Sequence, residues 1–290
     1  MILLAPAKIN LHLRVIGKRK DGYHNIETLF EKIALFDKIK IRPSNKLTIH
    51  TDSPSVPTGK KSLLYRTAES FREKFKVSAG AEVHVFKRIP IAAGLGGGSS
   101  DAAGLLKGLA KMHLGSFDPG ELLDIGAKLG ADIPFFLSNA SFAIARGKGD
   151  KITPLKLKNR FWHLIVRPPK KLLSGDIYTA YKKSYSGLTK RPSLIKILSP
   201  ATKALGNNIM GRLLWNDLER AIIKRSPLVG RLKESIKGLK MPHTLISGSG
   251  PALFSLFNER KEALKARQTL FNSLPFVKNK GWQIFVVSTA

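Results

Sequence analysis

Residues 89–106 read IPIAAGLGGGSSDAAGLL, and they place four glycines in five positions directly before two serines and an aspartate. Glycine is costly to order and has no side chain, so this density indicates that the backbone itself is used here. The run follows a strand pattern at 83–86 and precedes a helix pattern in which Ala102, Leu105, Leu106 and Leu109 recur at helical spacing. Backbone N–H groups and the dipole at a helix start bind anions, so the stretch predicts a phosphate site.

The glycine run does not match the common phosphate-loop motifs. A P-loop requires a lysine after its last glycine, and no lysine follows here. A G-x-G-x-x-G dinucleotide loop would need glycine in place of Ser99, and a protein-kinase glycine loop joins two strands. A flexible turn or a tightly packed helix start is the alternative, but the two hydroxyls that follow favour phosphate binding. Ser99 and Ser100 could donate to phosphate, ligate Mg²⁺ or cap the helix.

Length and composition indicate a globular protein. The chain has 290 residues, of which 43% are hydrophobic, enough for one large domain or two ordinary ones. No apolar stretch approaches about 20 residues, and the first 15 residues lack the pattern of a secretory signal. We therefore expect a soluble, unprocessed, cytoplasmic chain without a membrane partner. The absence of cysteine excludes disulfides, thiolate metal sites and cysteine nucleophiles.

The charge of the chain is strongly basic. A net charge of +30, from 50 Lys and Arg against 20 Asp and Glu, suggests a polyanionic partner such as nucleic acid. The basic residues lie in short scattered groups with few aromatic residues between them, as at 18–20, 60–61, 87–88, 167–171 and 190–191. A solvated basic surface is therefore the favoured interpretation, and nucleic-acid binding is the less favoured one.

Apolar patterns divide the chain into two mixed halves. The first half predicts strands at 37–42, 47–50 and 82–86, taken as antiparallel, and helices at 62–75, after the glycine run and at 121–129. The second half predicts strands at 161–166, 244–246, 252–257 and 283–287, and helices at 176–183, 205–225, 228–239 and 260–271. Low apolar density and Pro154 within 148–160 place a boundary there, giving domains 1–155 and 156–290. The irregular mixture predicts an α+β fold.

Three motifs resemble those of the GHMP kinases, the family that contains galactokinase, homoserine kinase and mevalonate kinase. Residues 90–103 match P-x-x-x-G-L-G-G-G-S-S-x-A-A, the family's nucleotide-phosphate loop. PAKINLHLRV (6–15) resembles the first family motif, and LISGSGPALFSLF (245–257) resembles the third, a second glycine loop. The resemblance spans nearly the whole chain. It implies an N-terminal domain like the second domain of ribosomal protein S5, a ferredoxin-like C-terminal domain and an active site in the cleft between them.

Four further stretches narrow the resemblance to one branch of the family. They are GYHNIETLF (22–30), GADIPFF (130–136), ARGKGDKITPL (145–155) and WNDLE (215–219). These stretches are similar to those of kinases whose alcohol substrate carries a cytidine diphosphate group. The implied reaction uses ATP, with Mg²⁺, to phosphorylate a hydroxyl of that small molecule, in a monomer or homodimer. A GHMP kinase for another small alcohol, such as homoserine or mevalonate, is the nearest alternative.

The resemblance also implies roles for individual residues. Asp132 is the implied general base for the hydroxyl, and Lys8 is the partner that holds the aspartate ionised and in place. Without the resemblance, Lys8 would be a surface lysine, and Asp132 would cap a helix or form a structural salt bridge. The implied ATP-binding residues are Ser62, Lys87, Pro90, Gly94, Leu95, Gly96, Gly97, Gly98, Ser99 and Ser100. The second glycine loop comprises Gly248, Ser249 and Gly250.

The implied substrate pocket contains side chains suited to a cytosine base. Tyr23 offers an aromatic face for stacking, and His24 offers polar groups for the base edge. A turn with an ordinary core tyrosine is the alternative for this pair. The remaining implied substrate-binding residues are Asn10, Phe30, Ser174 and Tyr178.

Two positions depart from the family pattern. The family usually has Asn-Leu near the adenine, where this chain has Ser62-Leu63, which puts one adenine hydrogen bond in question. Relatives often have Val-Ser-Thr where this chain has Leu-Leu-Ser at 172–174, so one hydroxyl is kept and one is lost. Neither position changes Lys8, Asp132 or the glycine run.

Overall fold

The structure is a computed structural model, and it describes residues 1–184, 193, 194, 198 and 212–290. Its first part is a seven-stranded sheet around two long antiparallel strands, β1 (Ile2–Lys18) and β2 (His24–Ser44). The strand order is β3-β4-β2-β1-β8, and β5 and β6 continue from the other end of β2. The shorter strands are β3 (Thr48–Thr51), β4 (Gly80–Phe86), β5 (Phe142–Arg146), β6 (Lys151–Leu155) and β8 (Trp215–Asn216).

The predicted strand at 37–42 is confirmed as part of β2. Ile39 and Ile41 are fully buried, whereas Lys38 is exposed, because successive side chains of a strand point to opposite faces of the sheet. β4 pairs antiparallel with β2, as expected, but β3 runs parallel to β4, so the antiparallel expectation is wrong for β3. The reason is the connection between β3 and β4. It contains the helix α1 (Leu63–Phe75), and a helical crossover joins parallel strands.

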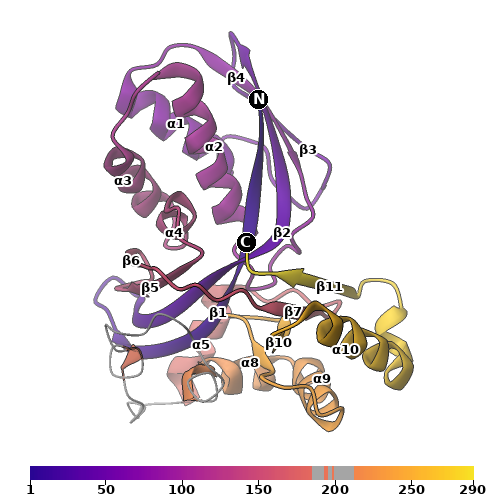
Figure 1. Cartoon of the computed structure of the whole chain (residues 1–290). Coiled ribbons are helices and arrows are strands. Elements are labelled where there is room, and N and C mark those ends of the chain that lie inside the picture. The colour runs from indigo at the N-terminus through magenta and orange to yellow at the C-terminus, as the bar shows by residue number, and fades with distance from the viewer. Residues whose placement is uncertain (185–192, 195–197, 199–211) are drawn as a thin grey trace.

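Four helices cover one face of the first sheet (Figure 1). They are α1, α2 (Gly97–His113), α3 (Pro119–Leu129) and α4 (Ile133–Leu137). The predicted apolar stripe of α2 is confirmed, because Ala102, Leu105, Leu106 and Leu109 are all buried in the core between the helices and the sheet. This packing fixes the direction in which the N-terminal end of α2 points.

The second part of the fold is a four-stranded antiparallel sheet with helices packed against it. Its order is β11-β7-β10-β9, formed by β7 (Trp162–Arg167), β9 (Leu245–Ile246), β10 (Leu253–Phe257) and β11 (Gln283–Ser288). The helices are α5 (Ser174–Ser184), α8 (Glu219–Arg225), α9 (Pro227–Gly238) and α10 (Arg260–Ser273), followed by the short 3₁₀ helix η1 (Pro275–Lys278). The α+β class is confirmed. No helix within the described residues is long and apolar enough to cross a membrane.

The predicted helix at 205–225 is confirmed only at its C-terminal end, as α8, and is wrong for residues 214–218. Residues 205–211, including Ile209, lie outside the described residues, and β8 interrupts the remainder before α8 begins. Asn216 donates to the carbonyls of Ile246 and Gly248, and Asp217 accepts a hydrogen bond from the backbone of Val15. These long-range bonds outweigh the helical apolar spacing, because Asn and Asp form helices poorly.

Several elements between 133 and 155 were not predicted at all. α4 is a single short turn of helix, and β5 and β6 lie close to the expected domain boundary. Pro154 suggested a break, yet it lies in β6, which pairs with β5 alone among the described strands. Proline is tolerated there because an edge strand leaves one row of backbone groups unpaired. The division at 155/156 remains a prediction.

Buried polar contacts join the two sheets. His163 of β7 and Glu31 of β2 are both fully buried, and His163 Nε2 lies 2.9 Å from Glu31 Oε1. Thr289 donates to the same carboxylate at 2.6 Å and pairs with Ile33 in an isolated bridge. β8, from the second half of the sequence, also pairs with β1. These contacts hold the two sheets in a fixed position relative to each other.

Candidate active site

Two cavities lie side by side in the structure and share part of their walls. The first, which we call the loop cavity, has a volume of about 410 Å³ and is lined by the glycine run and by Val56, Pro57, Leu63 and Leu64. The second, which we call the aromatic cavity, has a volume of about 720 Å³ and is lined by side chains from β1, β2, α5 and the turn between β1 and β2. Both cavities are lined by Lys8, Ser99, Asp132, Ser174 and Ser249.

The glycine run forms a tight loop that opens into the N-terminal end of α2. Gly94 and Gly96 have φ angles of 79° and 71°, in the left-handed region that favours glycine. A Cβ atom on Gly94 would lie 2.1 Å from the carbonyl oxygen of Ser247, so no side chain fits at that position. No side chain caps α2 at Gly96, and the first backbone N–H groups of a helix lack intrahelical partners. The loop therefore presents backbone donors to the loop cavity.

Three hydrogen bonds, from β1 and from the loop at 247–252, hold this loop in place. Lys8 N donates to the carbonyl of Leu95 at 2.9 Å, and Ala252 N donates to the carbonyl of Ala93 at 3.2 Å. The hydroxyl of Ser247 donates to the carbonyl of Gly94 at 3.0 Å. The two glycine loops are thus in contact. Ser249 lines both cavities and Gly248 lines the aromatic cavity, whereas Gly250 packs against Ile246 and Ile222.

Lys8 and Asp132 meet at the wall that the two cavities share. Lys8 is buried in β1, and its Nζ lies 3.5 Å from Asp132 Oδ2 and 2.6 Å from Asn10 Oδ1. The same ammonium lies 5.0 Å from the ring centroid of Phe30. Asp132 begins α4, but its side chain accepts no capping hydrogen bond from the described residues, so the carboxylate faces Lys8. This arrangement contradicts the view of Lys8 as an ordinary surface lysine.

Asn10 is buried, not exposed on the strand. Its Nδ2 donates to Thr28 Oγ1 at 2.8 Å, which fixes the amide so that Oδ1 faces Lys8 Nζ. Asn10 also lines the aromatic cavity. The amide can therefore orient the lysine and still contact a molecule in that cavity.

Aromatic rings from two elements form the outer part of the aromatic cavity. His24 stacks on Tyr178, with ring centroids 5.2 Å apart and an interplanar angle of 24°. Tyr23 is 59% exposed, and Lys148 Nζ lies 5.7 Å from its ring centroid. Burial raises the pKa of Tyr178, and the negative charge of Asp132 raises it further, so the phenol stays protonated. The predicted residues from β2 and α5 are thus brought together.

Lys87, a predicted ATP-binding residue, forms a buried ionic cluster in the wall of the loop cavity. Its ammonium contacts the carboxylates of Asp37 and Asp101, both almost fully buried. Asp37 also accepts backbone hydrogen bonds from Arg88 and Ile89, at the start of the glycine loop. Burial raises the pKa of Asp101 to about 7, against the lowering effect of Lys87. Asp37 and Asp101 were not predicted. Asp101 lies in the quoted motif, but nothing local connects it with Asp37.

Two of the predicted nucleotide-binding serines do not reach the cavities. Ser62 is buried and caps α1, since its hydroxyl accepts from Tyr65 N at 3.2 Å. Ser100 is also buried, and its hydroxyl has no hydrogen-bond partner among the described residues. Neither lines the loop cavity or the aromatic cavity. Ser99, by contrast, lines both.

Lys18 and Lys148 also line the aromatic cavity, and they were not predicted as site residues. Lys148 lies in the stretch 145–155 that supported the family resemblance. This stretch overlaps residues 148–160, whose low apolar density was interpreted as a domain boundary. Two cations beside aromatic rings suit a molecule that carries both a base and phosphate groups.

Comparisons with known proteins show the family of the chain. Residues 62–140 match the family model "GHMP kinases N terminal domain". The chain is 36% identical over 276 residues to the 4-diphosphocytidyl-2-C-methyl-D-erythritol kinase of Caldicellulosiruptor saccharolyticus, covering 93% of this chain and 92% of the relative. It is 37% identical over 266 residues to the enzyme of the same name from Lachnoclostridium phytofermentans, covering 91% and 90%. The chain belongs to the 4-diphosphocytidyl-2-C-methyl-D-erythritol kinases of the GHMP family.

Solved structures support the same family and fold. A crystal structure of 4-(cytidine 5'-diphospho)-2C-methyl-D-erythritol kinase superposes with a TM-score of 0.78 at 30% identity, covering both chains completely. A homoserine kinase from Cytophaga hutchinsonii superposes with a TM-score of 0.74 at 17% identity, covering 100% of this chain and 94% of that one. At 17% identity, the similarity to the homoserine kinase shows a shared fold and nothing more. The expected two-domain GHMP kinase fold is therefore confirmed.

Proposed function

We infer that the chain transfers the γ-phosphoryl group of ATP to the 2-hydroxyl of 4-diphosphocytidyl-2-C-methyl-D-erythritol, a step in non-mevalonate isoprenoid precursor synthesis. The observation that carries this proposal is the meeting of two cavities at Lys8 and Asp132. One cavity has the backbone donors that a polyphosphate needs, and the other has aromatic and cationic side chains for a cytidine diphosphate. A reacting hydroxyl between them would lie next to a carboxylate.

The loop cavity suits ATP as the phosphoryl donor. Leu63, Leu64 and Pro57 supply an apolar wall for the adenine, and residues 94–99 supply the donors for the phosphates. Ser62 caps α1 instead of lining this cavity, so the adenine hydrogen bond questioned at that position would have to come from another group. Phosphoryl transfer depends mainly on positioning and charge neutralisation, which a rigid loop provides.

Asp132 is the proposed general base. A positioned carboxylate that takes the proton of the attacking hydroxyl contributes roughly 100- to 10,000-fold in rate. Lys8, 3.5 Å away, holds the carboxylate by charge and is itself oriented by Asn10. Because Lys8 N also donates to the carbonyl of Leu95, the base and the phosphate loop keep a fixed spacing.

Mg²⁺ is part of this proposal, and the residues present fit it. Magnesium prefers oxygen ligands and retains several waters, so it needs few ligands from the protein. Ser99 offers a hydroxyl at the junction of the cavities, whereas Ser100 is buried in the core. Of the two serines considered, Ser99 is therefore the better ligand. When bound, the ion neutralises charge on the transferred group and on its leaving oxygen.

The size of the aromatic cavity favours a nucleotide-linked alcohol over a small one. A volume of about 720 Å³ lies in the range of pockets that enclose drug-sized ligands, which homoserine or mevalonate would leave mostly empty. Tyr23, His24 and Tyr178 would contact the cytosine, and Lys18 and Lys148 would contact the diphosphate. Turnover of homoserine or mevalonate, without turnover of the cytidyl compound, would refute the assignment.

The test of the catalytic role is Asp132→Asn. We expect turnover to fall at least roughly 100-fold while the affinity for ATP stays nearly unchanged, because the amide keeps the shape and loses the base. Asp176→Asn is the matched control, since Asp176 is exposed on α5 and lines neither cavity. ATP consumption by the two purified variants gives turnover, and nucleotide titration gives affinity. Near-normal turnover of Asp132→Asn would remove Asp132 as the base.

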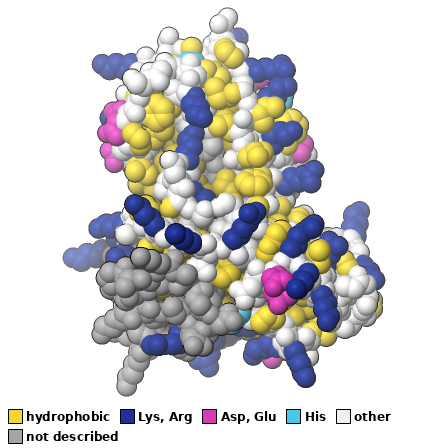
Figure 2. Space-filling model, viewed as in Figure 1, with side chains coloured by type: hydrophobic (Ala, Val, Ile, Leu, Met, Phe, Trp, Pro, Cys, Tyr) yellow, Lys and Arg dark blue, Asp and Glu magenta, His cyan; other side chains and the backbone are white. Residues whose placement is uncertain are grey.

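Nucleic-acid binding is a less supported alternative. Lysine and arginine side chains are spread over the face shown in Figure 2 and do not gather in one stripe. Binding of that kind would weaken steeply with salt, and a steep slope without ATP binding would favour it. The cytoplasmic location and the state as a monomer or homodimer remain predictions.

A further inference from the structure

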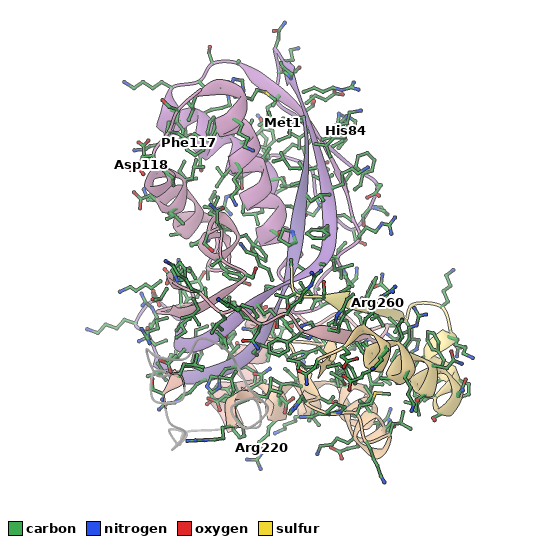
Figure 3. The ribbon with its side chains drawn as sticks, in the orientation of Figure 1. Met1, His84, Phe117, Asp118, Arg220 and Arg260 are labelled. Carbon is green, nitrogen blue, oxygen red and sulfur yellow. The ribbon has the colours of Figure 1, made fainter. Side chains whose placement is uncertain are left out.

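A cluster of metal-binding side chains lies on the first sheet, apart from both cavities. His50, Glu82 and His84 each offer one ligand atom, and these atoms all lie within 4.8 Å of one another. None of the three residues lines the loop cavity or the aromatic cavity. Figure 3 shows His84 and Met1 at the end of this sheet that lies away from Arg220 and Arg260 of the second half.

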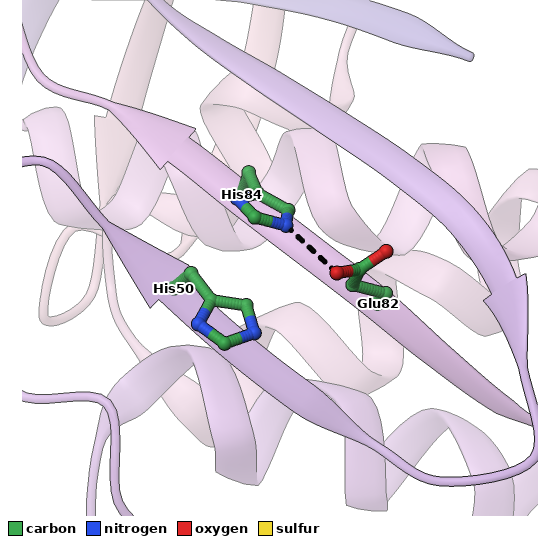
Figure 4. A group of neighbouring side chains, drawn as sticks. All are labelled: His50, Glu82 and His84. Carbon is green, nitrogen blue, oxygen red and sulfur yellow. Dashed lines mark hydrogen bonds and ion pairs between the residues drawn. The ribbon is translucent and has the colours of Figure 1, made fainter.

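The strand register places the three side chains on one face of the sheet. His50 of β3 is the parallel neighbour of His84 of β4. Glu82 precedes His84 by two residues on the same strand, so both side chains point to the same side. The three side chains therefore converge without any unusual backbone conformation (Figure 4).

The side-chain geometry is close to that of a three-ligand site. The imidazole rings of His50 and His84 stack with centroids 4.6 Å apart and an interplanar angle of 27°. His84 Nε2 lies 3.0 Å from Glu82 Oε1. Zinc binds imidazole nitrogen at about 2.0–2.1 Å and carboxylate oxygen at about 2.0–2.2 Å, which requires donor atoms somewhat closer than 4.8 Å. His50 is exposed and Glu82 and His84 are half-buried, so their side chains have room for the small rotations that this requires.

The donor set and the local charge select a class of metal ion. Lys40 and Arg42 of β2 are the register partners of His84 and Glu82, so cationic side chains flank the cluster. A hard ion such as Mg²⁺, held mainly by charge and oxygen, is disfavoured there. Two imidazoles and one carboxylate instead suit ions that bind nitrogen strongly, such as Zn²⁺, Ni²⁺ and Cu²⁺.

We propose that His50, Glu82 and His84 form a binding site for one divalent transition-metal ion of the zinc class, with coordination positions left open to water. The ion bridges β3, the short edge strand, to β4. β3 leads to Asp52, which accepts a hydrogen bond from Lys87 N at 2.9 Å, and then to Ser55, Val56 and Pro57 in the wall of the loop cavity. The site thus ties together the two strands that lead into that wall.

The test is zinc titration of tag-free, chelator-treated protein in the absence of nucleotide, with a chromophoric chelator as competitor. We expect wild type to bind one more equivalent of Zn²⁺ than His50→Ala or His84→Ala. Loss of a direct ligand should weaken binding at least about tenfold, since changes outside the ligand shell already cost 10- to 100-fold. His113→Ala is the control, because this half-buried histidine of α2 is not part of the cluster.

Further measurements make the outcome decisive. Bound Co²⁺ should give a visible absorption band in wild type that both histidine variants lose, and excess Mg²⁺ should leave the bound zinc in place. Glu82→Gln should weaken zinc binding while preserving the fold, with circular dichroism as the check on all variants. Equal zinc stoichiometry and affinity in wild type, His50→Ala and His84→Ala would overturn the proposal, as would failure of wild type to bind zinc.

Discussion

Replacing Lys87 by methionine should destabilise the protein strongly. The ammonium of Lys87 contacts two carboxylates, and Asp37 and Asp101 are 0% and 2% exposed. Methionine fills most of the volume but leaves both carboxylates without their cation. Removal of one partner of a buried ion pair costs about 3–5 kcal/mol, because an uncompensated charge remains in a low-dielectric interior. We expect the free energy of unfolding to fall by that amount at pH 7.

Asp101→Asn should have a much smaller effect than Lys87→Met. It removes the carboxylate in excess and leaves one cation with one anion. Because burial raises the pKa of Asp101 to about 7, from an unfolded value near 3.8, the folded state binds more protons between these values. Stability contributed by this group therefore falls as pH rises from about 4 to about 7. The variant should lack this fall, so its stability relative to wild type should increase over that range.

Urea unfolding at pH 5 and pH 8 measures both effects through the transition midpoint, with the slope as a check on the unfolding mechanism. The expected order at pH 8 is Lys87→Met far below wild type, and Asp101→Asn equal to wild type or above it. If Asp101→Asn were as destabilised as Lys87→Met at both values of pH, the excess-charge reasoning would be wrong. Asp101 would then be a required structural anion.

Two further predictions concern backbone conformation and a buried lysine. Gly94→Ala should destabilise the protein by at least about 2 kcal/mol, because the left-handed backbone and the carbonyl of Ser247 both exclude a Cβ atom. Gly98→Ala, where a Cβ would meet nothing within 4 Å, should leave thermal unfolding unchanged. Burial lowers the pKa of Lys32 to about 7, so wild type should gain stability relative to Lys32→Met as pH rises from about 7 to about 10. A difference in stability between wild type and Lys32→Met that does not change with pH would contradict the lowered pKa of Lys32.

The conformation of the glycine loop could be predicted from the residues themselves. Glycine density, the adjacent hydroxyls and the helix pattern after residue 98 all indicate one local geometry, and the conformations of Gly94 and Gly96 agree with it. Lys8 and Asp132 are different, because 123 intervening residues separate them and neither is distinctive alone. Their juxtaposition was implied only by the family resemblance. Their catalytic roles remain predictions.

The features that sequence analysis missed or predicted wrongly share a physical cause. Each of them depends on contacts with residues that are distant in the sequence. Asp37 acquires its role from Lys87, Arg88 and Ile89, about fifty residues away. The helix expected at 205–225 is interrupted because Asn216 bonds to backbone near residue 247, which local apolar spacing does not encode. The parallel pairing of β3 depends on the path of α1 over the sheet.

The wall shared by the two cavities has a consequence for inhibitor design. Lys8, Ser99 and Asp132 line both cavities, so a single compound can extend from one into the other without crossing a barrier of protein. Joining a polyphosphate mimic to a cytidine mimic through a short bridge would make the second contact intramolecular, which can raise affinity by orders of magnitude when the linker length matches the span. The best linker would pass beside Asp132, where the proposed phosphoryl transfer would occur.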